Sequence, residues 1–218
     1  MTGRILQTCV GMPANVCFAG KNHMTGIFKR PVDGKVAVNL LHLDGDGQAD
    51  LQVHGGRDKA IYVYPACHYA TWEAELGIAT LEAAQFGENL TVGGIDETSV
   101  IIGDEYRVGS ALVTVTQPRL PCFKLGIRMN DAAFPKRFLA SGRLGFYLRV
   151  LQTGELQTGD TFELLERPAH RISVHGLWRM VFGPDRSSDV AAHALDALPH
   201  IDSGWHRRLR MIAEAVPQ

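Results

Sequence analysis

The residues with the clearest potential for chemistry lie in the segment QPRLPCFKLG, residues 117–126. Cys122 directly follows Pro121, and Pro118 precedes it by four positions. A proline fixes its own φ, cannot donate a backbone hydrogen bond and pushes the preceding residue toward an extended conformation. The pattern therefore predicts a stiff mount for Cys122, outside ordinary helices and central strands.

Two cations, Arg119 and Lys124, flank this cysteine. Neighbouring positive charge favours a thiolate, the form that attacks electrophiles or ligates a soft metal. No histidine lies close in the sequence, so local spacing does not indicate a Cys–His nucleophile. The simpler alternative is a small buried core residue, which is the commoner fate of a free cysteine.

A second candidate segment is HGGRDKA, residues 54–60. Gly55 and Gly56 would let backbone amides approach a ligand closely. The side chains around them that ionise are His54, Arg57, Asp58 and Lys59. Taken alone, the segment is better explained as a glycine turn with solvated charges.

Three further polar groups carry weaker signals. FGENLTVGG, residues 86–94, places Glu88 and Asn89 in a glycine-flanked turn before a strand, and Lys29 lies in a basic pair that is typical of a protected strand edge. The aspartates of HLDGDGQAD fail the EF-hand pattern, because glycine and glutamate are misplaced. Turn chemistry explains those aspartates better.

The bulk composition excludes several classes of protein. The chain has 218 residues, 45% of them hydrophobic and 21% charged, and its formal net charge is -1. This balance gives no argument for a nucleic-acid or membrane partner. No signal-peptide core or membrane-length apolar run is present, so we expect a cytoplasmic protein. The four cysteines and nine histidines show no zinc-ligand spacing.

Up to about residue 168 the sequence consists of short β-branched runs separated by glycine and aspartate turns. A helix is predicted from Pro65 to Gly77, and a shorter one, interrupted by Pro135, over residues 131–140. Many short strands with few helices predict a closed or strongly bent, barrel-like sheet in a β-rich mixed α/β fold. The runs cover residues 4–10, 36–41, 60–64, 89–92, 99–102, 105–108, 111–117, 146–152 and 161–166.

Beyond Pro168 the periodicity becomes helical, which predicts a core domain at 1–168 and a C-terminal three-helix bundle at 169–218. The helical segments are 173–184, 187–199 and 203–216, each with a serine at its start. We expect Trp178 and Trp205 to fill the core of this bundle.

Taken together, four segments resemble the MOSC domain family, named after the C-terminal domain of molybdenum cofactor sulfurase. The resemblance covers about residues 25–165, and the helical tail resembles the 3-alpha domain of the YiiM-type branch. The four segments are DGQADLQVHGGRDKAIYVY, FGENLTVGG, IGDEYRVGSALVTVTQPRLPCFKL and LQTGELQTGD.

The resemblance implies a barrel-like core that binds the molybdenum cofactor, with Cys122 as a sulfur ligand of molybdenum. Family members related to amidoxime-reducing components reduce N-hydroxylated compounds, including N-hydroxylated base analogues. His54 is then a candidate proton relay. The candidate cofactor-binding residues are Lys29, Gly55, Gly56, Arg57, Asp58, Lys59, Glu88, Asn89 and Arg119.

Reduction also requires electrons, and the sequence has neither a flavin fingerprint nor an iron–sulfur cysteine set. An external flavoprotein reductase is therefore expected as the electron donor. Two rival interpretations stay open: a sulfur carrier with a persulfide on Cys122, and a non-enzymatic carrier of the cofactor. Full sulfurases fuse the domain to a desulfurase that binds pyridoxal phosphate, for which this chain has no room.

Overall fold

The core of the protein is a sheet that closes on itself, as the strand pattern predicted. In the computed structural model, which describes residues 2–49 and 55–215, the strands follow the order β12, β8, β9, β10, β6, β7, β1, and β1 pairs back to β12. The bounds are β1 (Gly3–Val10), β6 (Ile61–Pro65), β7 (Leu90–Gly93), β8 (Glu105–Val108), β9 (Ala111–Pro118), β10 (Phe146–Gln152) and β12 (Thr161–Glu166).

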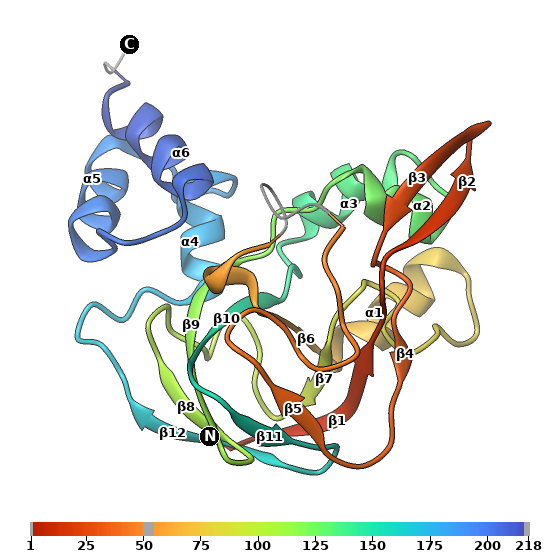
Figure 1. Ribbon diagram of the computed structural model, residues 1–218. Coiled ribbons are helices and arrows are strands. Elements are labelled where there is room, and N and C mark those ends of the chain that lie inside the picture. Colours follow the sequence, from red (N-terminus) through yellow and green to blue (C-terminus); the bar gives the residue numbers. More distant parts are fainter. Residues whose placement is uncertain (1, 50–54, 216–218) are drawn as a thin grey trace.

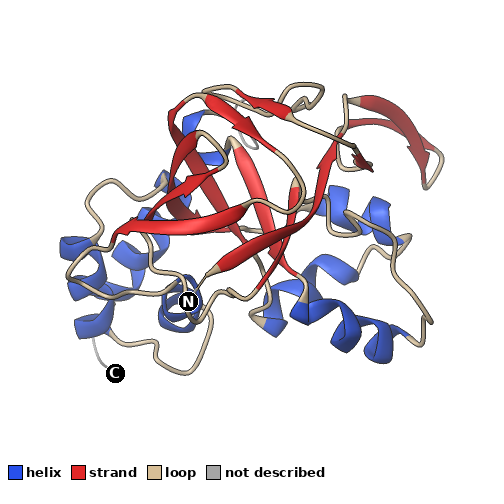
Figure 2. Cartoon of the chain, turned by 90° about the horizontal axis from the view of Figure 1, so that it is seen from below, coloured by secondary structure: helices blue, strands red, loops and turns tan. Residues whose placement is uncertain are grey.

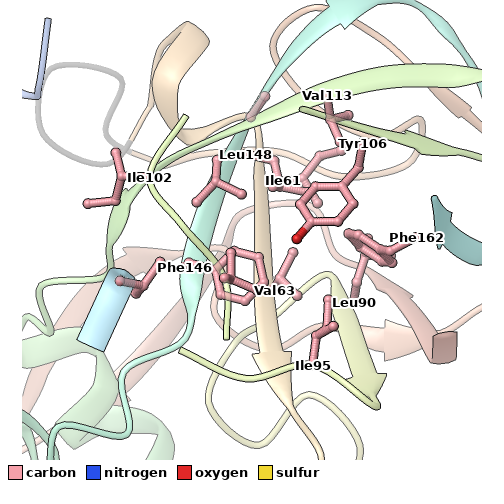
Figure 3. Close-up of a cluster of buried hydrophobic side chains, with 14 of the residues drawn as sticks. Ile61, Val63, Leu90, Ile95, Ile102, Tyr106, Val113, Phe146, Leu148 and Phe162 are labelled. Atoms are coloured by element: carbon pink, nitrogen blue, oxygen red, sulfur yellow. The ribbon is translucent and has the colours of Figure 1, made fainter. Parts of the chain in front are cut away.

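The interior of the barrel is filled by alternate side chains of these strands. Along β9, for example, Ala111, Val113 and Val115 are buried while the residues between them are partly exposed. Figure 3 shows side chains from β6, β8, β9, β10 and β12 pointing toward one another inside the barrel. The hydrophobic core therefore lies within the closed sheet, so polar sites must form at its ends and its outer surface.

Smaller elements extend this barrel. Strand β4 (Arg30–Pro31) pairs with β1, and β5 (Val36–Val38) pairs with β11 (Gly154–Leu156). Strands β2 (Ala14–Phe18) and β3 (Lys21–Thr25) form a hairpin that projects from the barrel (Figure 1). Among the described barrel strands, β6 and β7 are a parallel pair, and α1 (Cys67–Leu76) lies in the connection between them.

The helices form two groups on opposite sides of the barrel (Figures 1 and 2). Helices α2 (Phe123–Met129) and α3 (Phe134–Ser141) join α1 in an aromatic cluster with Tyr64, Trp72 and Phe138. Helices α4 (Val174–Val181), α5 (Ser188–Ala197) and α6 (Ser203–Ala213) form the other group. No helix in the described ranges is both long and apolar enough to cross a membrane.

The C-terminal helices pack onto the barrel through both of their tryptophans. Trp205 is buried, and its Nε1 donates a hydrogen bond to the Pro118 carbonyl at 3.2 Å. The Nε1 of Trp178 donates to the Leu139 carbonyl at 2.9 Å, in the aromatic cluster around α3. The expectation that both residues fill the core of the bundle is confirmed for Trp205, which is buried in one cluster with side chains of all three helices. It is wrong for Trp178, which is only partly buried and packs against the aromatic cluster around α3. The boundary at residue 168 stays a prediction.

Several local expectations also need correction. Residues 99–102 form no strand, because the Asp104 carboxylate accepts from the Ile101 amide at 2.9 Å and holds them in turns. The strand expected over residues 36–41 ends at Val38. Pro65 ends β6 and does not start α1, while Pro135 lies in the first turn of α3, where it interrupts nothing.

The predicted serine N-caps are present in two of the three C-terminal helices, α4 and α5. The hydroxyls of Ser173 and Ser187 accept from backbone amides three residues later, as N-cap serines do. In α6 the cap is Asp202 instead of the expected serine, and its carboxylate accepts from the Gly204 amide at 2.8 Å. The same carboxylate pairs with Lys59 at 3.1 Å, which links the start of α6 to the segment before β6.

Candidate functional site

Cys122 lies in the short connection between the end of β9 and the start of α2, and it is half-buried. Its backbone is extended, with φ −124° and ψ 177°, and its carbonyl accepts from the Leu125 amide at 3.0 Å. The sequence therefore placed the cysteine itself correctly outside regular structure. It did not foresee that Pro118 still belongs to the predicted strand, which is a central one, or that Phe123 begins a helix. Pro118 is tolerated there because it is the last residue of the strand.

The thiol side of this connection opens into a cleft of about 600 Å³, its open mouth included. We call it the Cys122 cleft. Its walls come from the loops after β3 and β5, the loop before β7, and strands β6 and β10. The lining residues are Thr25, Gly26, Ile27, Lys29, Asp46, Gly47, Gln48, Ala49, Lys59, Tyr62, Gly87, Asn89, Arg119, Cys122, Lys124 and Tyr147.

The charges of the Cys122 cleft are mainly positive. Lys29, Lys59, Arg119 and Lys124 line it, against one carboxylate, that of Asp46. Of the candidate cofactor-binding residues, the structure thus brings Lys29, Lys59, Asn89 and Arg119 together around Cys122. A cleft of this charge is complementary to an anionic ligand such as a phosphate ester.

Asp46 organises one wall of this cleft. Its carboxylate accepts from the Gly11 amide at 2.9 Å and from the Asn89 side chain at 3.0 Å, and it forms an ion pair with the Lys29 ammonium. Burial lowers the pKa of Lys29, while the Asp46 carboxylate opposes this shift. Sequence reasoning missed Asp46 because it lies among turn-forming aspartates and glycines, and no local signal distinguishes a buried aspartate from a solvated one.

The Asn89 side chain joins three segments of the cleft. Its Oδ1 accepts from the Tyr62 amide at 3.0 Å, and its Nδ2 donates to the Cys9 carbonyl at 3.2 Å as well as to Asp46. Both ends of the amide are therefore used within the protein. Asn89 fixes the shape of the wall and has little capacity left for a ligand.

Arg119 is buried beside the cysteine. Its guanidinium donates to the Phe86 carbonyl and lies over the Tyr62 ring, 4.5 Å from the centroid. A guanidinium has five N–H donors, so these contacts leave donors for the cleft. Arg119 thus provides a positive charge whose position is set by packing.

Backbone close to the cleft is held tightly by glycine. A Cβ added at Gly26 would lie 2.6 Å from the Gly47 carbonyl oxygen, and one at Gly87 would lie 2.6 Å from Ile27. These loops approach one another more closely than any side chain would permit. The three glycines line the cleft, so part of its wall is backbone, which suits a flat polar ligand.

Other candidate residues lie outside the lining of this cleft. Gly56 has φ +92°, so the predicted glycine turn is present, but Gly55, Gly56 and Arg57 do not line the cleft. The Asp58 carboxylate pairs with Arg149. His54 falls outside the residues that the structure describes, and the ligand roles of all these residues stay predictions.

Glu88 is buried and turned into the protein. Its carboxylate accepts from the Tyr69 hydroxyl, from the Thr91 hydroxyl at 3.2 Å and from the Phe86 amide at 3.1 Å. Burial raises its pKa, and these hydrogen bonds partly offset the shift. In this arrangement Glu88 stabilises the loop that precedes β7.

Tyr147 is a site residue that the sequence did not indicate, because in FYLRVLQ it reads only as a strand aromatic. It lies on β10 opposite Gln117 of β9, and it lines the Cys122 cleft. Burial raises the pKa of its hydroxyl, with the nearby Arg119 acting in the opposite direction. The phenol therefore stays protonated at neutral pH and is a potential proton donor beside the cysteine.

The side chains of the cleft suit a metal that is bound within an organic cofactor better than they suit a bare metal ion. The described residues contain no group of three or more His, Cys, Asp or Glu that could hold a metal. Cys122 alone supplies one soft sulfur ligand, and the surrounding cations and backbone suit the anionic, planar remainder of such a group.

A closed β-barrel with appended helices and a basic cleft that holds one cysteine defines the class of protein. Comparisons with known proteins give the family. The family model of the MOSC domain matches residues 50–163. The protein YflK of Bacillus subtilis is 45% identical over 170 residues, covering 78% of this chain and 76% of that protein. A protein of Gibberella moniliformis named "Reductase" is 35% identical over 203 residues, which is 92% of this chain but 36% of that protein.

Solved structures agree. The crystal structure of YiiM from Geobacillus stearothermophilus superimposes with a TM-score of 0.78 and 30% identity, covering 96% of this chain and 98% of that one. The chain belongs to the MOSC family, in its YiiM-type branch.

Proposed function

We propose that this protein is a reductase of small N-hydroxylated compounds that works with the molybdenum cofactor, with Cys122 as a ligand of molybdenum. The observation that carries the proposal is a half-buried thiol in a cleft whose charged side chains are mainly positive. The MOSC family is associated with this cofactor, and one relative is named a reductase.

Different residues of the Cys122 cleft would bind different parts of the cofactor. Cys122 would bind the metal, and Lys59, Arg119 and Lys124 would neutralise the phosphate. The Gly26–Gly47 wall would lie against the pterin. When bound, the cofactor supplies the two-electron chemistry, and the protein supplies binding, orientation and protons.

The overall reaction consumes two electrons and two protons: the N–O bond of the hydroxylamine breaks, an amine forms, and the hydroxyl leaves as water. A general acid is therefore needed near the metal ligand. The Tyr147 hydroxyl lines the cleft together with Cys122 and has no hydrogen bond to the described residues. We assign it the role of donating a proton to the departing hydroxyl, with His54 as the alternative from the sequence.

The electrons would come from an external flavoprotein reductase, and we place the reaction in the cytoplasm. Both points rest on the sequence alone. The prolines next to Cys122 support the ligand role, because a metal ligand held in one geometry leaves little motion to suppress on binding.

The first experiment measures molybdenum and pterin in protein produced in a cofactor-competent host and in a host that cannot make the cofactor. Wild type is compared with Cys122→Ser and with Cys17→Ser, a matched control at an exposed cysteine of the β2–β3 hairpin. We expect near-equal molybdenum and pterin in the wild type and in Cys17→Ser. We expect Cys122→Ser to lose the metal.

Reduction of an N-hydroxylated test compound by a chemically reduced dye then separates the rival functions. A protein that holds the cofactor but does not reduce the compound would be a cofactor carrier. A protein that holds neither metal nor pterin, but carries a persulfide on Cys122, would be a sulfur carrier. Either result would overturn the reductase proposal.

A further inference from the structure

A second cavity meets the Cys122 cleft and has no role in the account so far. It encloses about 1050 Å³, its open mouth included, between the end of β9 and the start of α6, and we call it the α6 groove. The two cavities share Lys59, Cys122 and Tyr147. Its remaining lining residues are Gln117, Pro118, Leu120, Pro121, Asp202, Ser203, Gly204, Trp205, Arg207 and Arg208. A ligand in this groove would therefore contact the residues that also face the metal ligand.

Gln117 provides the first sign that the groove is built for a ligand. It is 1% exposed, and its Nε2 has no hydrogen-bond partner among the described residues. Burying an amide donor without an acceptor is costly, so such groups usually have a partner that the protein alone does not provide. Because Gln117 lines the groove and lies opposite Tyr147 in the sheet, a ligand acceptor placed beside Cys122 would satisfy it.

The charges at the rim give the second sign. Asp202 pairs with Lys59 at 3.1 Å. Arg207 and Arg208 also line the groove, and neither guanidinium forms an ion pair with a carboxylate of the described residues. Nη1 of Arg208 donates to the Gly204 carbonyl at 2.8 Å, so this side chain is held at the first turn of α6. The N-terminus of α6 is capped by the Asp202 carboxylate, so the positive charge available at this rim is that of the two guanidiniums. Guanidiniums suit a phosphate, which they can bind through two N–H donors at once.

We propose that the α6 groove binds the reducible substrate, and that it selects N-hydroxylated molecules of nucleotide size that carry a phosphate. The phosphate binds Arg207 and Arg208, and an acceptor on the ring binds the Gln117 amide. This places the N–O group between Tyr147 and Cys122. The assignment of the reducible group rests on the proposed function, whereas the phosphate-dependent binding does not.

The test uses two probes with the same reducible group: the N-hydroxylated derivative of cytidine, with and without a monophosphate. Binding to the holoprotein is measured by equilibrium dialysis, without an electron donor. We expect the phosphorylated probe to bind at least tenfold more tightly. The Arg207→Gln/Arg208→Gln variant should lose this preference and still bind the unphosphorylated probe. Arg186→Gln, a matched change at an exposed arginine outside the groove, should behave as wild type.

Gln117→Leu supplies an independent arm. Because the change replaces an unpartnered buried donor by an apolar group of similar size, we expect unchanged or higher thermal stability together with at least tenfold weaker binding of both probes. A purely structural glutamine would show the reverse, namely lower stability with unchanged binding.

The groove and the reductase proposal fail in different ways. Equal binding of the two probes, or binding that is insensitive to the arginine variant, would overturn the assignment of the groove. Tight, phosphate-dependent binding without any reduction when a reduced dye is added would support the groove and refute the reductase function.

Discussion

The buried ion pair between Lys29 and Asp46 predicts an unequal response to mutation. The side chains are 8% and 2% exposed, and the Asp46 carboxylate also accepts from the Gly11 amide and from Asn89. Asp46→Asn keeps the shape of the side chain but leaves the Lys29 ammonium buried without a counter-charge. Breaking a buried pair in this way costs about 3–5 kcal/mol of the free energy of unfolding.

Lys29→Met should cost less, about 1–2 kcal/mol, because the carboxylate keeps two charge-assisted donors. The double variant should be more stable than Asp46→Asn alone, since it removes the unpaired ammonium. The expected coupling energy between the two sites therefore exceeds the cost of Lys29→Met, so it is at least about 1 kcal/mol, within the range for contacting residues.

The assay is urea-induced unfolding of wild type, both single variants and the double variant. It is followed by tryptophan fluorescence and by far-UV circular dichroism, whose transitions must coincide for the free energies to be comparable. For a chain of this size, the loss in Asp46→Asn corresponds to a fall in Tm of about 6–20 °C. Additive effects of the two mutations, within about 0.5 kcal/mol, would refute the reasoning, because they would mean that the two charges do not interact.

Two further predictions follow from the packing around the site. Trp205→Phe removes the donor to the Pro118 carbonyl. It should lower the free energy of unfolding by about 1–3 kcal/mol and also lower the cofactor content. Trp178→Phe loses the hydrogen bond to Leu139 and should lower the stability alone. Since burial raises the pKa of Glu88 above 4.5, the folded protein holds a proton that the unfolded chain releases, and wild-type stability should fall as pH rises through this window. The free energies of unfolding of wild type and Glu88→Gln are measured by urea titration between about pH 5 and about pH 8. As pH rises, the variant should become more stable relative to wild type, by at most about 1.4 kcal/mol per pH unit. A difference that does not change with pH would contradict the raised pKa.

Periodicity predicted the barrel and its strands well where burial alternates regularly. Strand β9 was expected at 111–117 and is found at Ala111–Pro118. The β2–β3 hairpin was missed because its residues are mostly exposed or half-buried, so they carry no hydrophobic alternation. Sequence patterns of this kind report burial, and an element without a buried face gives no signal.

The site shows a different limit of sequence reasoning. Cys122 stood out because two prolines mark its backbone, which is a local property. Asp46, Gln117 and Tyr147 matter because of residues far away in the sequence, and no local pattern identifies an aspartate, a glutamine or a tyrosine whose partner is distant. Their importance became visible only through burial and hydrogen bonding in the folded protein.

The position of Cys122 also explains why the C-terminal helices are part of the site. The cysteine follows a central strand whose last carbonyl, that of Pro118, accepts from Trp205 of α6. The cap of α6, Asp202, pairs with Lys59, which lines both cavities. The barrel therefore supplies the strand that precedes the cysteine, and α6 holds Pro118 and Lys59 beside it. Removal of the helices would leave Trp205's acceptor and Lys59 without these partners, so the Cys122 segment should lose its defined geometry even if the barrel still formed.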